Sequence, residues 1–553
     1  MGRNLRSTSF FAIVLAAVAV VLLRITLDWA HYPHSRSVCV IGLYAAVLPA
    51  LVWFWRSSRT GAPETFRVPD CRLLVIAIFG VAAAAVGFSY DHGHTISDES
   101  AYQFQARIFA SGRMKAEPMP GAVVNPAKTP PEIYFEQQVD SSRGWFSKYP
   151  PGWPFVLAAG YLLRCPWLVN PILGVLLLLL VNKLARPWGV PTQTLSVLVA
   201  GTSGYTLLQS VGFMSHGLAA VIGAAAFASL FHAARTERLG AVFLGFAFVV
   251  VGTEIRPFTG ALVALVCTGY ILYAFWSRQR LLWPSIGIIA CAGLLSVALF
   301  CVINFLYTGS PLVSPYALSR GLTQVDNMTL DPLRIVANLG SFWRASWTDT
   351  LWSTFPFVLV AAAYAGRYEC QFRRELICLA LPLPLLVIAH LTQNEPSASL
   401  DGERYYYEGY ALLCIVAVRG FLLLGSRWQI RAREAALGLL VLFGIQATFF
   451  VVVIRDIELR LEPWRLVYRS AAEPPTPPLI FLSSTGPDFA PKHANWNEAE
   501  WRTARVVFLN DPGAARRDEV ACRFNRPAYR VVSYDVISRS IFIRDYSAVC
   551  PAS

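Results

Sequence analysis

Two adjacent carboxylates, Asp98 and Glu99, follow a long apolar run and open a stretch with helical character. Carboxylates placed just outside a membrane span can act as a general base or hold a metal ion. A simpler interpretation is that they stabilise the dipole of a helix that Ser97 caps. In that helix Tyr102 follows Asp98 by one turn and shares its face. Asp98, Glu99 and Tyr102 are therefore the first candidates for a site.

A second group of candidates is basic. Lys148 and Tyr149 begin the proline-rich stretch KYPPGWP, and Arg256 lies in a short turn between two apolar runs. An ionisable residue at membrane depth is costly and is a functional candidate by default, and an arginine fork matches the oxygens of a phosphate. For Arg256, pairing with Glu254 or snorkelling to the lipid headgroups is an equally good explanation.

Polar and aromatic residues also gather at the edges of two other apolar runs. Arg404 is followed directly by Tyr405, and His216 stands at the outer end of its run. Tyr405 can stack on a sugar, but tyrosines at a membrane interface usually act as anchors. His216 can hydrogen-bond a substrate, and a polar contact between helices explains it equally well. His92 and His94 lack a third ligand, so they predict no metal site.

The composition places these residues in a membrane protein. Of the 553 residues 55% are hydrophobic and 15% are charged, and the mean hydropathy is +0.47, far more apolar than an average soluble domain. The formal net charge of +13 does not indicate nucleic-acid binding, because the basic residues fall between apolar runs. A shorter run at 155–163 predicts an interfacial or re-entrant helix. About thirteen runs are long enough to span a bilayer, near residues 10–28, 37–55, 72–90, 165–182, 192–210, 213–232, 240–255, 257–276, 283–307, 349–366, 375–391, 406–424 and 435–454.

The distribution of basic residues predicts the orientation of these spans. Arginine and lysine concentrate in alternate gaps, for example at Arg56, Lys183 and Arg278, whereas the other short gaps hold few. Under the positive-inside rule the N-terminus is cytoplasmic and the C-terminus is outside. The first run lacks a clear cleavage site, so we interpret it as a span and not as a signal peptide. Segments 91–164 and 308–348 then become outer loops.

The sequence predicts two domains, a helical membrane domain over 1–454 and a small outer domain over 455–553. A proline-rich linker at 473–478 leads into the outer domain. Alternating apolar and polar residues with helix-compatible stretches between them indicate a small α/β layer. The expected strands are 479–484, 505–511, 529–535 and 540–546, and the expected helices are 497–504 and 513–524. Cys522 and Cys550 share this domain and can form a disulfide in an oxidising compartment.

Several of these stretches resemble the GT-C glycosyltransferases, notably the protein O-mannosyltransferases and the lipid A aminoarabinose transferases. The resemblance covers most of residues 72–425. Three spans before Asp98 and a short α/β-like tail differ from the better-known subfamilies, so the resemblance implies no particular acceptor. It rests on DESAYQFQARIFASGRM at 98–114, YPPGWPFVLAAGYLL at 149–163, FMSHGLAAVIGAAAF at 213–227, GFAFVVVGTEIRP at 245–257, GSPLVSPYALSRG at 309–321 and ERYYYEGYALLCIVAVRG at 403–420.

The resemblance implies a GT-C-like fold and transfer of a sugar from a polyprenyl phosphate on the outer face of a membrane. It assigns the catalytic carboxylate to Asp98. We therefore expect Asp98, with Glu99 beside it, to act in an inverting transfer of a hexose or pentose, with Asp98 as the general base. Arg256, Lys148 and Arg404 are expected to bind the donor phosphate.

The remaining candidates, Tyr102, Tyr149, Tyr405 and His216, are expected to contact the substrates. The implied partners are the lipid-linked sugar donor, membrane lipid and an acceptor that is an envelope glycan, a lipid or a protein, at the outer face of a bacterial inner membrane. Metal-free base catalysis is favoured, with a divalent metal on the two carboxylates as the alternative. If the protein is an enzyme, the alternative to transfer of a single sugar is transfer of a whole oligosaccharide. A glycolipid transporter or flippase and a non-catalytic envelope assembly protein are the alternatives to an enzyme.

Overall fold

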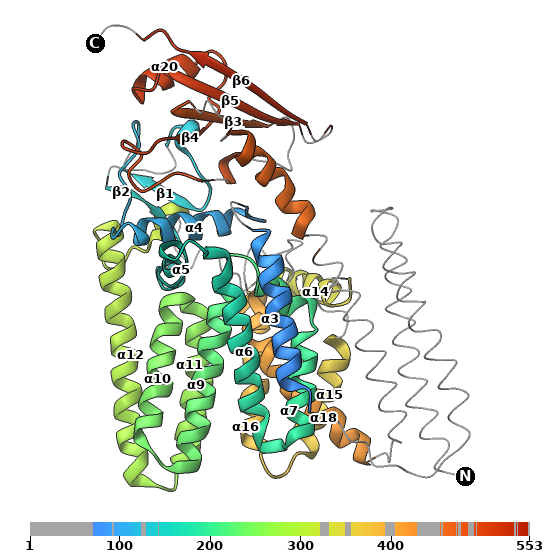
Figure 1. Cartoon of the computed structure of the whole chain (residues 1–553). Helices are drawn as coiled ribbons and strands as arrows, with labels where there is room; N and C mark the ends of the chain where they lie inside the picture. The colour runs from blue at the N-terminus through green and yellow to red at the C-terminus, as the bar shows by residue number, and fades with distance from the viewer. Residues whose placement is uncertain are drawn as a thin grey trace, which may run out of the picture.

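Helices dominate the chain, and Figure 1 shows them as a bundle that smaller helices and strands cover at one end. The apolar runs expected at 10–28 and 37–55, and nearly all of the run at 435–454, lie outside the residues that the structure describes, as do Asp91 and His92. The computed structural model describes residues 70–90, 93–122, 129–141, 143–320, 331–348, 355–392, 404–427, 457–471, 477–484, 491–493, 495–535 and 540–550, with a few single residues between them.

The expected apolar runs between residues 72 and 424 coincide with helices. Within the described residues, six helical stretches are long and apolar enough to cross a membrane; the count of thirteen spans stays a prediction. The apolar run expected at 375–391 is divided into two helices at Pro382, because proline has no backbone N–H to continue the preceding helix. The helices are α3 (Arg72–Phe88), α6 (Val169–Ala185), α7 (Val190–Gly201), α8 (Gly204–Gln209), α9 (His216–Thr236), α10 (Leu239–Ile255), α11 (Pro257–Phe275), α12 (Gln279–Thr308), α15 (Phe355–Tyr368), α16 (Arg373–Ala380), α17 (Pro382–Leu391) and α18 (Tyr407–Arg427).

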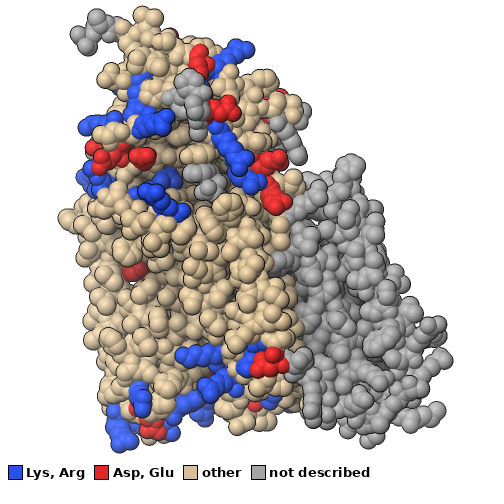
Figure 2. All heavy atoms as spheres, in the orientation of Figure 1, with Lys and Arg blue, Asp and Glu red and all other residues tan. Residues whose placement is uncertain are grey.

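The bundle has the apolar exterior of a membrane domain. Figure 2 shows charged side chains gathered at its two ends, with a broad and mostly uncharged belt between them. In α12, none of the residues in the most apolar 18-residue stretch is buried inside the protein, whereas 72% of the matching stretch of the helix that includes α18 is buried. Side chains such as Leu294 and Val297 are therefore placed to face lipid, while α18 lies at the centre of the packed core.

The segment 91–164, expected to be the first outer segment, covers one end of the bundle with its described residues (Figure 1). It contains α4 (Ser97–Ala110), the short α5 (Gly152–Leu162) and an antiparallel pair of strands, β1 (Gln138–Ser141) and β2 (Gly144–Ser147). The short interfacial or re-entrant helix expected at 155–163 corresponds to α5, which packs against α4. α5 also lies close to the end of α10, since a Cβ at Gly152 would overlap the backbone of Glu254. The expected cap is wrong, since Ile96 is the N-cap and Ser97 is the first helical residue.

The outer segment after α12 reaches the same end of the bundle. It contains α13 (Pro315–Arg320) and α14 (Pro332–Thr348), and Lys148 from the first outer segment lies over the ring of Tyr316 on α13. The expectation that these segments share one face is confirmed by this contact.

The C-terminal part forms a four-stranded sheet in the order β4–β3–β5–β6, with α20 (Arg517–Arg523) packed against it. β3 (Leu479–Ser484) runs parallel to β4 (Val507–Asn510) and to β5 (Ala528–Asp535), and β5 pairs antiparallel with β6 (Ser540–Ser547). All four expected strands are confirmed. Cys522 at the end of α20 is bonded to Cys550, which follows β6.

The helix expected at 497–504 is wrong, and a helix over 457–471 is an addition to the expected elements. Asn497 lies outside any helix, and its side chain accepts from the backbone N–H of Phe508 and donates to the carbonyl of the same residue. Its backbone N–H donates to the side chain of Asn495. These tertiary hydrogen bonds outweigh the local helical propensity of the segment.

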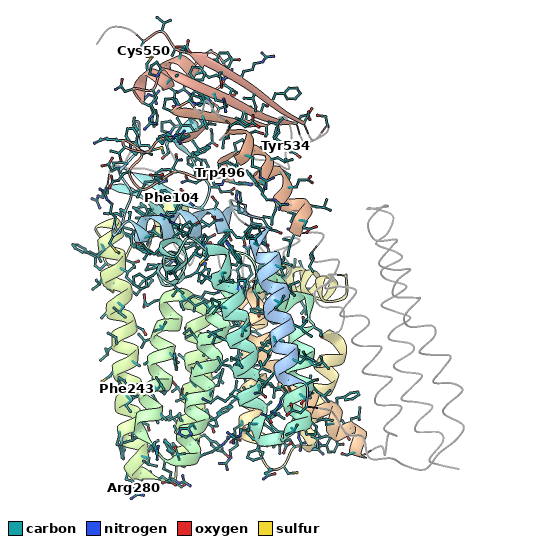
Figure 3. The ribbon with its side chains drawn as sticks, in the orientation of Figure 1. Phe104, Phe243, Arg280, Trp496, Tyr534 and Cys550 are labelled. Carbon is teal, nitrogen blue, oxygen red and sulfur yellow. A yellow bond between two sulfur atoms is a disulfide. The ribbon has the colours of Figure 1, made fainter. Side chains whose placement is uncertain are left out.

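The C-terminal domain is fastened onto α4, and Figure 3 shows Phe104 and Trp496 at this junction. Arg107 of α4 donates to the carbonyls of Asn495 and Asn497. The buried carboxylate of Glu132 accepts from two arginines of the sheet domain, Arg516 and Arg523. α4 is thus fixed between the bundle and the outer domain.

Candidate functional site

Asp98, at the second position of α4, forms an ion pair with Arg404. Nη2 of Arg404 donates to Oδ2 of Asp98 at 2.8 Å, and both side chains are nearly buried. The two residues are 306 positions apart in the sequence, so only the fold brings them together. Among the described residues no group hydrogen-bonds Oδ1 of Asp98. One oxygen is oriented by the arginine, and the other is available to accept a proton.

Glu99, the other carboxylate of the pair, is engaged with the backbone. Its Oε2 accepts from the N–H of Thr95 at 2.7 Å and from the Thr95 hydroxyl at 2.9 Å. Its Oε1 accepts from the N–H of Phe213 at 2.7 Å, in the loop that precedes α9. Both oxygens are therefore used to join the start of α4 to the bundle, a geometry that suits a positioning role.

Arg256, between α10 and α11, pairs with the buried Glu408 of α18. Nε of Arg256 lies 3.0 Å from Oε1 of Glu408, and Nδ1 of His216 lies 3.1 Å from the same oxygen. Nη1 of Arg256 is 3.3 Å from Nε2 of His216 and donates to the Ser215 hydroxyl. Within the described residues the arginine is therefore held by α18 and not by Glu254, so the pairing considered from the sequence is not the one formed.

Tyr102 links the two charged groups. Its hydroxyl is 3.2 Å from the Ser215 hydroxyl, and its ring stacks on that of Tyr149 at 4.6 Å. Burial raises the pKa of Tyr102 to about 12, and burial also raises the pKa of Tyr149 well above its usual value. Both phenols therefore stay protonated at neutral pH and can donate hydrogen bonds.

Tyr405 lies between the cationic and aromatic groups. The guanidinium carbons of Arg404 and Arg256 are 5.2 Å and 5.5 Å from the centre of its ring. His390 of α17 stacks on this ring at 4.7 Å, and His216 meets it edge-on at 5.9 Å. This ring contacts both arginines, and an interfacial anchor alone does not require such contacts.

Lys148 lies at the outer edge of the cluster. Its Nζ is 5.1 Å from the centre of the Tyr149 ring and 4.6 Å from that of Tyr316. It is connected to the start of α4 through the stacked rings of Tyr149 and Tyr102. His94 lies elsewhere, buried against Trp464 at 4.2 Å between ring centres.

All nine site residues expected from the sequence thus lie in one connected group, which the structure enlarges. Glu408, Ser215 and His390 are additions. A carboxylate within an apolar run is a recognised signal of function, and Glu408 carries that signal because it stands four residues after Arg404 at the start of α18. Among the described residues, no group of three or more histidine, cysteine or acidic side chains is arranged to hold a metal ion.

Comparison with known proteins gives likenesses in structure. No family model matches the sequence, and no curated protein matches it. The structure of ArnT from Cupriavidus metallidurans bound to undecaprenyl phosphate superimposes with a TM-score of 0.51 at 13% identity, over 83% of this chain and 93% of that chain. The Archaeoglobus fulgidus oligosaccharyltransferase in the apo form gives a TM-score of 0.50 at 12% identity, over 83% of this chain and 69% of that one.

Both of these proteins are membrane glycosyltransferases of the GT-C superfamily. The chain therefore has the GT-C fold, as the resemblance in sequence implied. At these identities the likeness concerns the fold, and the activity has to be argued from the site itself.

Proposed function

We propose that this protein is a glycosyltransferase that moves a sugar from a polyprenyl phosphate to an acceptor on the outer face of the membrane. The observation that carries the proposal is the Asp98 carboxylate, which Arg404 holds by one oxygen at the covered end of a GT-C bundle. Arg256 lies in the same cluster, bridged to α4 through Ser215 and Tyr102. A base and two cations at one place match the charges that develop in such a transfer.

The reaction follows from these positions. Oδ1 of Asp98 accepts the proton of an acceptor hydroxyl while the hydroxyl oxygen attacks the anomeric carbon of the sugar. The bond between that carbon and the phosphate oxygen breaks, and the lipid phosphate leaves with the electron pair. Because attack and departure take place on opposite sides, the anomeric centre is inverted.

The leaving phosphate requires positive charge. The guanidinium groups of Arg256 and Arg404 both lie near the ring of Tyr405. Both can donate N–H groups to phosphate oxygens. Lys148, which lies over Tyr149 and Tyr316, is a third cation in reach of a flexible polar headgroup. The fold-related ArnT structure is bound to undecaprenyl phosphate, so this lipid is the probe of choice for the donor end of the site.

The site residues have divided tasks in this proposal. Asp98 is the catalytic base, and Glu99 positions it by fastening α4 to Phe213. Tyr102, Tyr149, Tyr405 and His216 line the space between the charged groups and contact the sugar. The orientation predicted by the basic residues puts this end of the bundle and the C-terminal domain in the periplasm of a bacterial inner membrane, where the acceptor is an envelope glycan, lipid or protein.

The deciding experiment replaces Asp98 by Asn, which keeps the size of the side chain and removes the basic oxygen. A strain that lacks the protein is complemented with the wild type, with Asp98→Asn or with Asp331→Asn. Asp331 is exposed at the start of α14 and serves as the matched control. Envelope glycans are compared by mass spectrometry after the three proteins are brought to equal membrane abundance.

If the proposal is right, one sugar increment is missing in the null strain and with Asp98→Asn and is present with Asp331→Asn. An increment of several sugars would indicate transfer of an oligosaccharide. Full restoration by Asp98→Asn would exclude a catalytic role for this carboxylate and would favour a transporter or an assembly protein.

A further inference from the structure

A pocket lies beside the cluster, between the loop that precedes β1, the strand pair β1–β2 and the end of α13. It has a volume of about 160 Å³ and is lined by Gln138, Trp145 and Lys148, among others. This volume is roughly ten times the 10–15 Å³ that a cavity needs to hold one water molecule. The pocket therefore accommodates a larger polar molecule.

Two residues that line this pocket each carry a buried donor that has no partner among the described residues. Nε2 of Gln138 and Nε1 of Trp145 are both buried without a hydrogen bond, and their side chains are 6% and 0% exposed. The orientation of the Gln138 amide is determined, because its Oε1 accepts from Nδ2 of Asn495 at 2.6 Å and the nitrogen must point elsewhere. A buried unpaired donor costs about 1–3 kcal/mol, so two at one pocket indicate a ligand that supplies acceptors.

The other residues that line the pocket indicate what kind of molecule supplies these hydrogen-bond acceptors. Lys148 contributes a positive charge, and Tyr134 and Trp145 contribute aromatic surface. The carboxylate of Glu136 is matched locally, with its Oε2 2.6 Å from Nε2 of His493. Donors and a cation next to aromatic rings suit a saccharide, whose hydroxyl oxygens accept hydrogen bonds and whose C–H faces pack on rings.

Two of the residues that line the pocket are linked to the proposed catalytic site. Gln137 in its wall donates through Nε2 to the hydroxyl of Ser97, the residue that precedes Asp98. Lys148 is followed by Tyr149, which stacks on Tyr102. The wall of the pocket is thus hydrogen-bonded to the residue next to the carboxylate on α4.

We infer that this pocket binds a saccharide of the acceptor, through hydrogen bonds from Gln138 and Trp145 and with Lys148 facing its oxygen atoms. The inference rests on the proposed function and names the acceptor as a glycan or a glycolipid. A neutral sugar and a uronic acid both offer oxygen atoms that accept hydrogen bonds. Only the uronic acid also offers a carboxylate that can pair with the charge of Lys148.

Two conservative substitutions test the inference. Trp145→Phe removes the donor and keeps an aromatic ring against Phe104 and Phe135. Gln138→Glu keeps the oxygen that accepts from Asn495 and replaces the donor by an acceptor. Trp188→Phe is the matched control, because Trp188 also has a buried Nε1 without a described partner and lies at η5 (Arg186–Trp188), outside the pocket.

Binding is measured directly on the full-length protein in detergent micelles, by saturation-transfer difference NMR with the methyl glycosides of glucose and glucuronic acid. We expect saturation transfer with the wild type and Trp188→Phe, and a loss of about tenfold in affinity with Trp145→Phe and Gln138→Glu. A stronger signal from the glucuronide, reduced by Lys148→Gln, identifies an acidic sugar; equal signals identify a neutral one. No saturation transfer with the wild type, or equal transfer in all variants, would overturn the inference.

The cellular experiment separates this inference from the proposed function. With both correct, the sugar increment falls about tenfold with each pocket variant, while affinity for undecaprenyl phosphate stays at the wild-type value. If Asp98→Asn abolishes the increment and both pocket variants retain it in full, the enzyme stands and the acceptor pocket is refuted. If Asp98→Asn retains it, the proposed function fails, and the NMR result still decides whether the pocket binds a saccharide.

Discussion

Arg256 and Glu408 form a buried ion pair, with 3.0 Å between Nε and Oε1, that joins the α10–α11 turn to the start of α18. The carboxylate is 2% exposed, and its second oxygen has no hydrogen-bond partner among the described residues. Such a pair holds the guanidinium in one orientation, and breaking it leaves one charge buried without compensation. Its geometry therefore suits the presentation of Arg256 to a phosphate.

Replacing Glu408 by Gln is expected to destabilise the protein by about 3 kcal/mol, because Arg256 is left without a counter-charge. The double variant Glu408→Gln with Arg256→Gln is expected to recover most of this loss, since both charges are then gone. Thermal unfolding in detergent measures both effects. Affinity for undecaprenyl phosphate should fall about tenfold in the double variant. A double variant whose destabilisation equals the sum of the single ones would show that the two side chains act independently.

The contact between Arg404 and Asp98 should control the rate of transfer. Arg404→Gln removes the charged hydrogen bond that orients the carboxylate, and we expect the rate to fall about 100-fold. Arg404→Lys keeps the charge without the planar fork and should give an intermediate rate. The control is Arg419→Gln, because Arg419 lies on α18 and forms a comparable pair with Glu369, away from the cluster. Equal rates for Arg404→Gln and Arg419→Gln would contradict this role.

Position 212 requires a glycine, because the side chain of Glu99 lies directly against the backbone there. A Cβ at position 212 would overlap Oε1 of Glu99, the oxygen that accepts from Phe213. The loop cannot move away easily, since Nδ2 of Asn170 donates to the carbonyl of Met214 and Nε1 of Trp153 donates to that of Phe213. We therefore expect Gly212→Ala to displace the start of α4.

The measurement is the transfer rate together with membrane abundance. Gly212→Ala is expected to reduce the rate about 100-fold through misplacement of Asp98. Gly240→Ala is the control, because nothing lies within 4 Å of a Cβ at that position. A wild-type rate for Gly212→Ala would show that the joint between Glu99 and Phe213 is not needed to place the base.

The sequence permits prediction of site residues that stand at the ends of apolar runs. Asp98, Arg256 and Arg404 each stand at or shortly beyond the end of such a run, where charge is conspicuous. Glu408 carries the same signal, although the tyrosines beside it are typical of a membrane interface.

The different tasks of Asp98 and Glu99 depend on tertiary contacts. The two carboxylates are adjacent, and what distinguishes them is an N–H from Phe213 and a guanidinium from Arg404. No local pattern encodes contacts over such separations. The same holds for the helix expected at 497–504, where hydrogen bonds from Asn497 to the strand β4 override propensity. The strands of the outer domain were predictable, because each is a short alternating run bounded by turn residues.

Burial of His94 should make the stability of the protein depend on pH. Burial, followed by the nearby charges of His493 and Arg107, lowers the pKa of His94 to about 3. The unfolded chain takes up a proton at this residue near pH 6.5, and the folded chain does not do so until about pH 3. The stabilisation is therefore complete above pH 6.5 and is lost progressively as the pH falls from 6.5 towards 3.

The expected loss from this one residue is about 2 kcal/mol at pH 5. It is measured as the change in unfolding temperature between pH 7.5 and pH 5, for the wild type and for His94→Phe. Phenylalanine keeps a ring against Trp464 and does not titrate, so the variant should be less sensitive to acid than the wild type. Because His94 lies where the helix over 457–471 meets the first outer segment, acid should weaken the attachment of the outer domain first. An acid sensitivity that is unchanged by His94→Phe would assign it to other groups, such as the pair formed by Glu136 and His493.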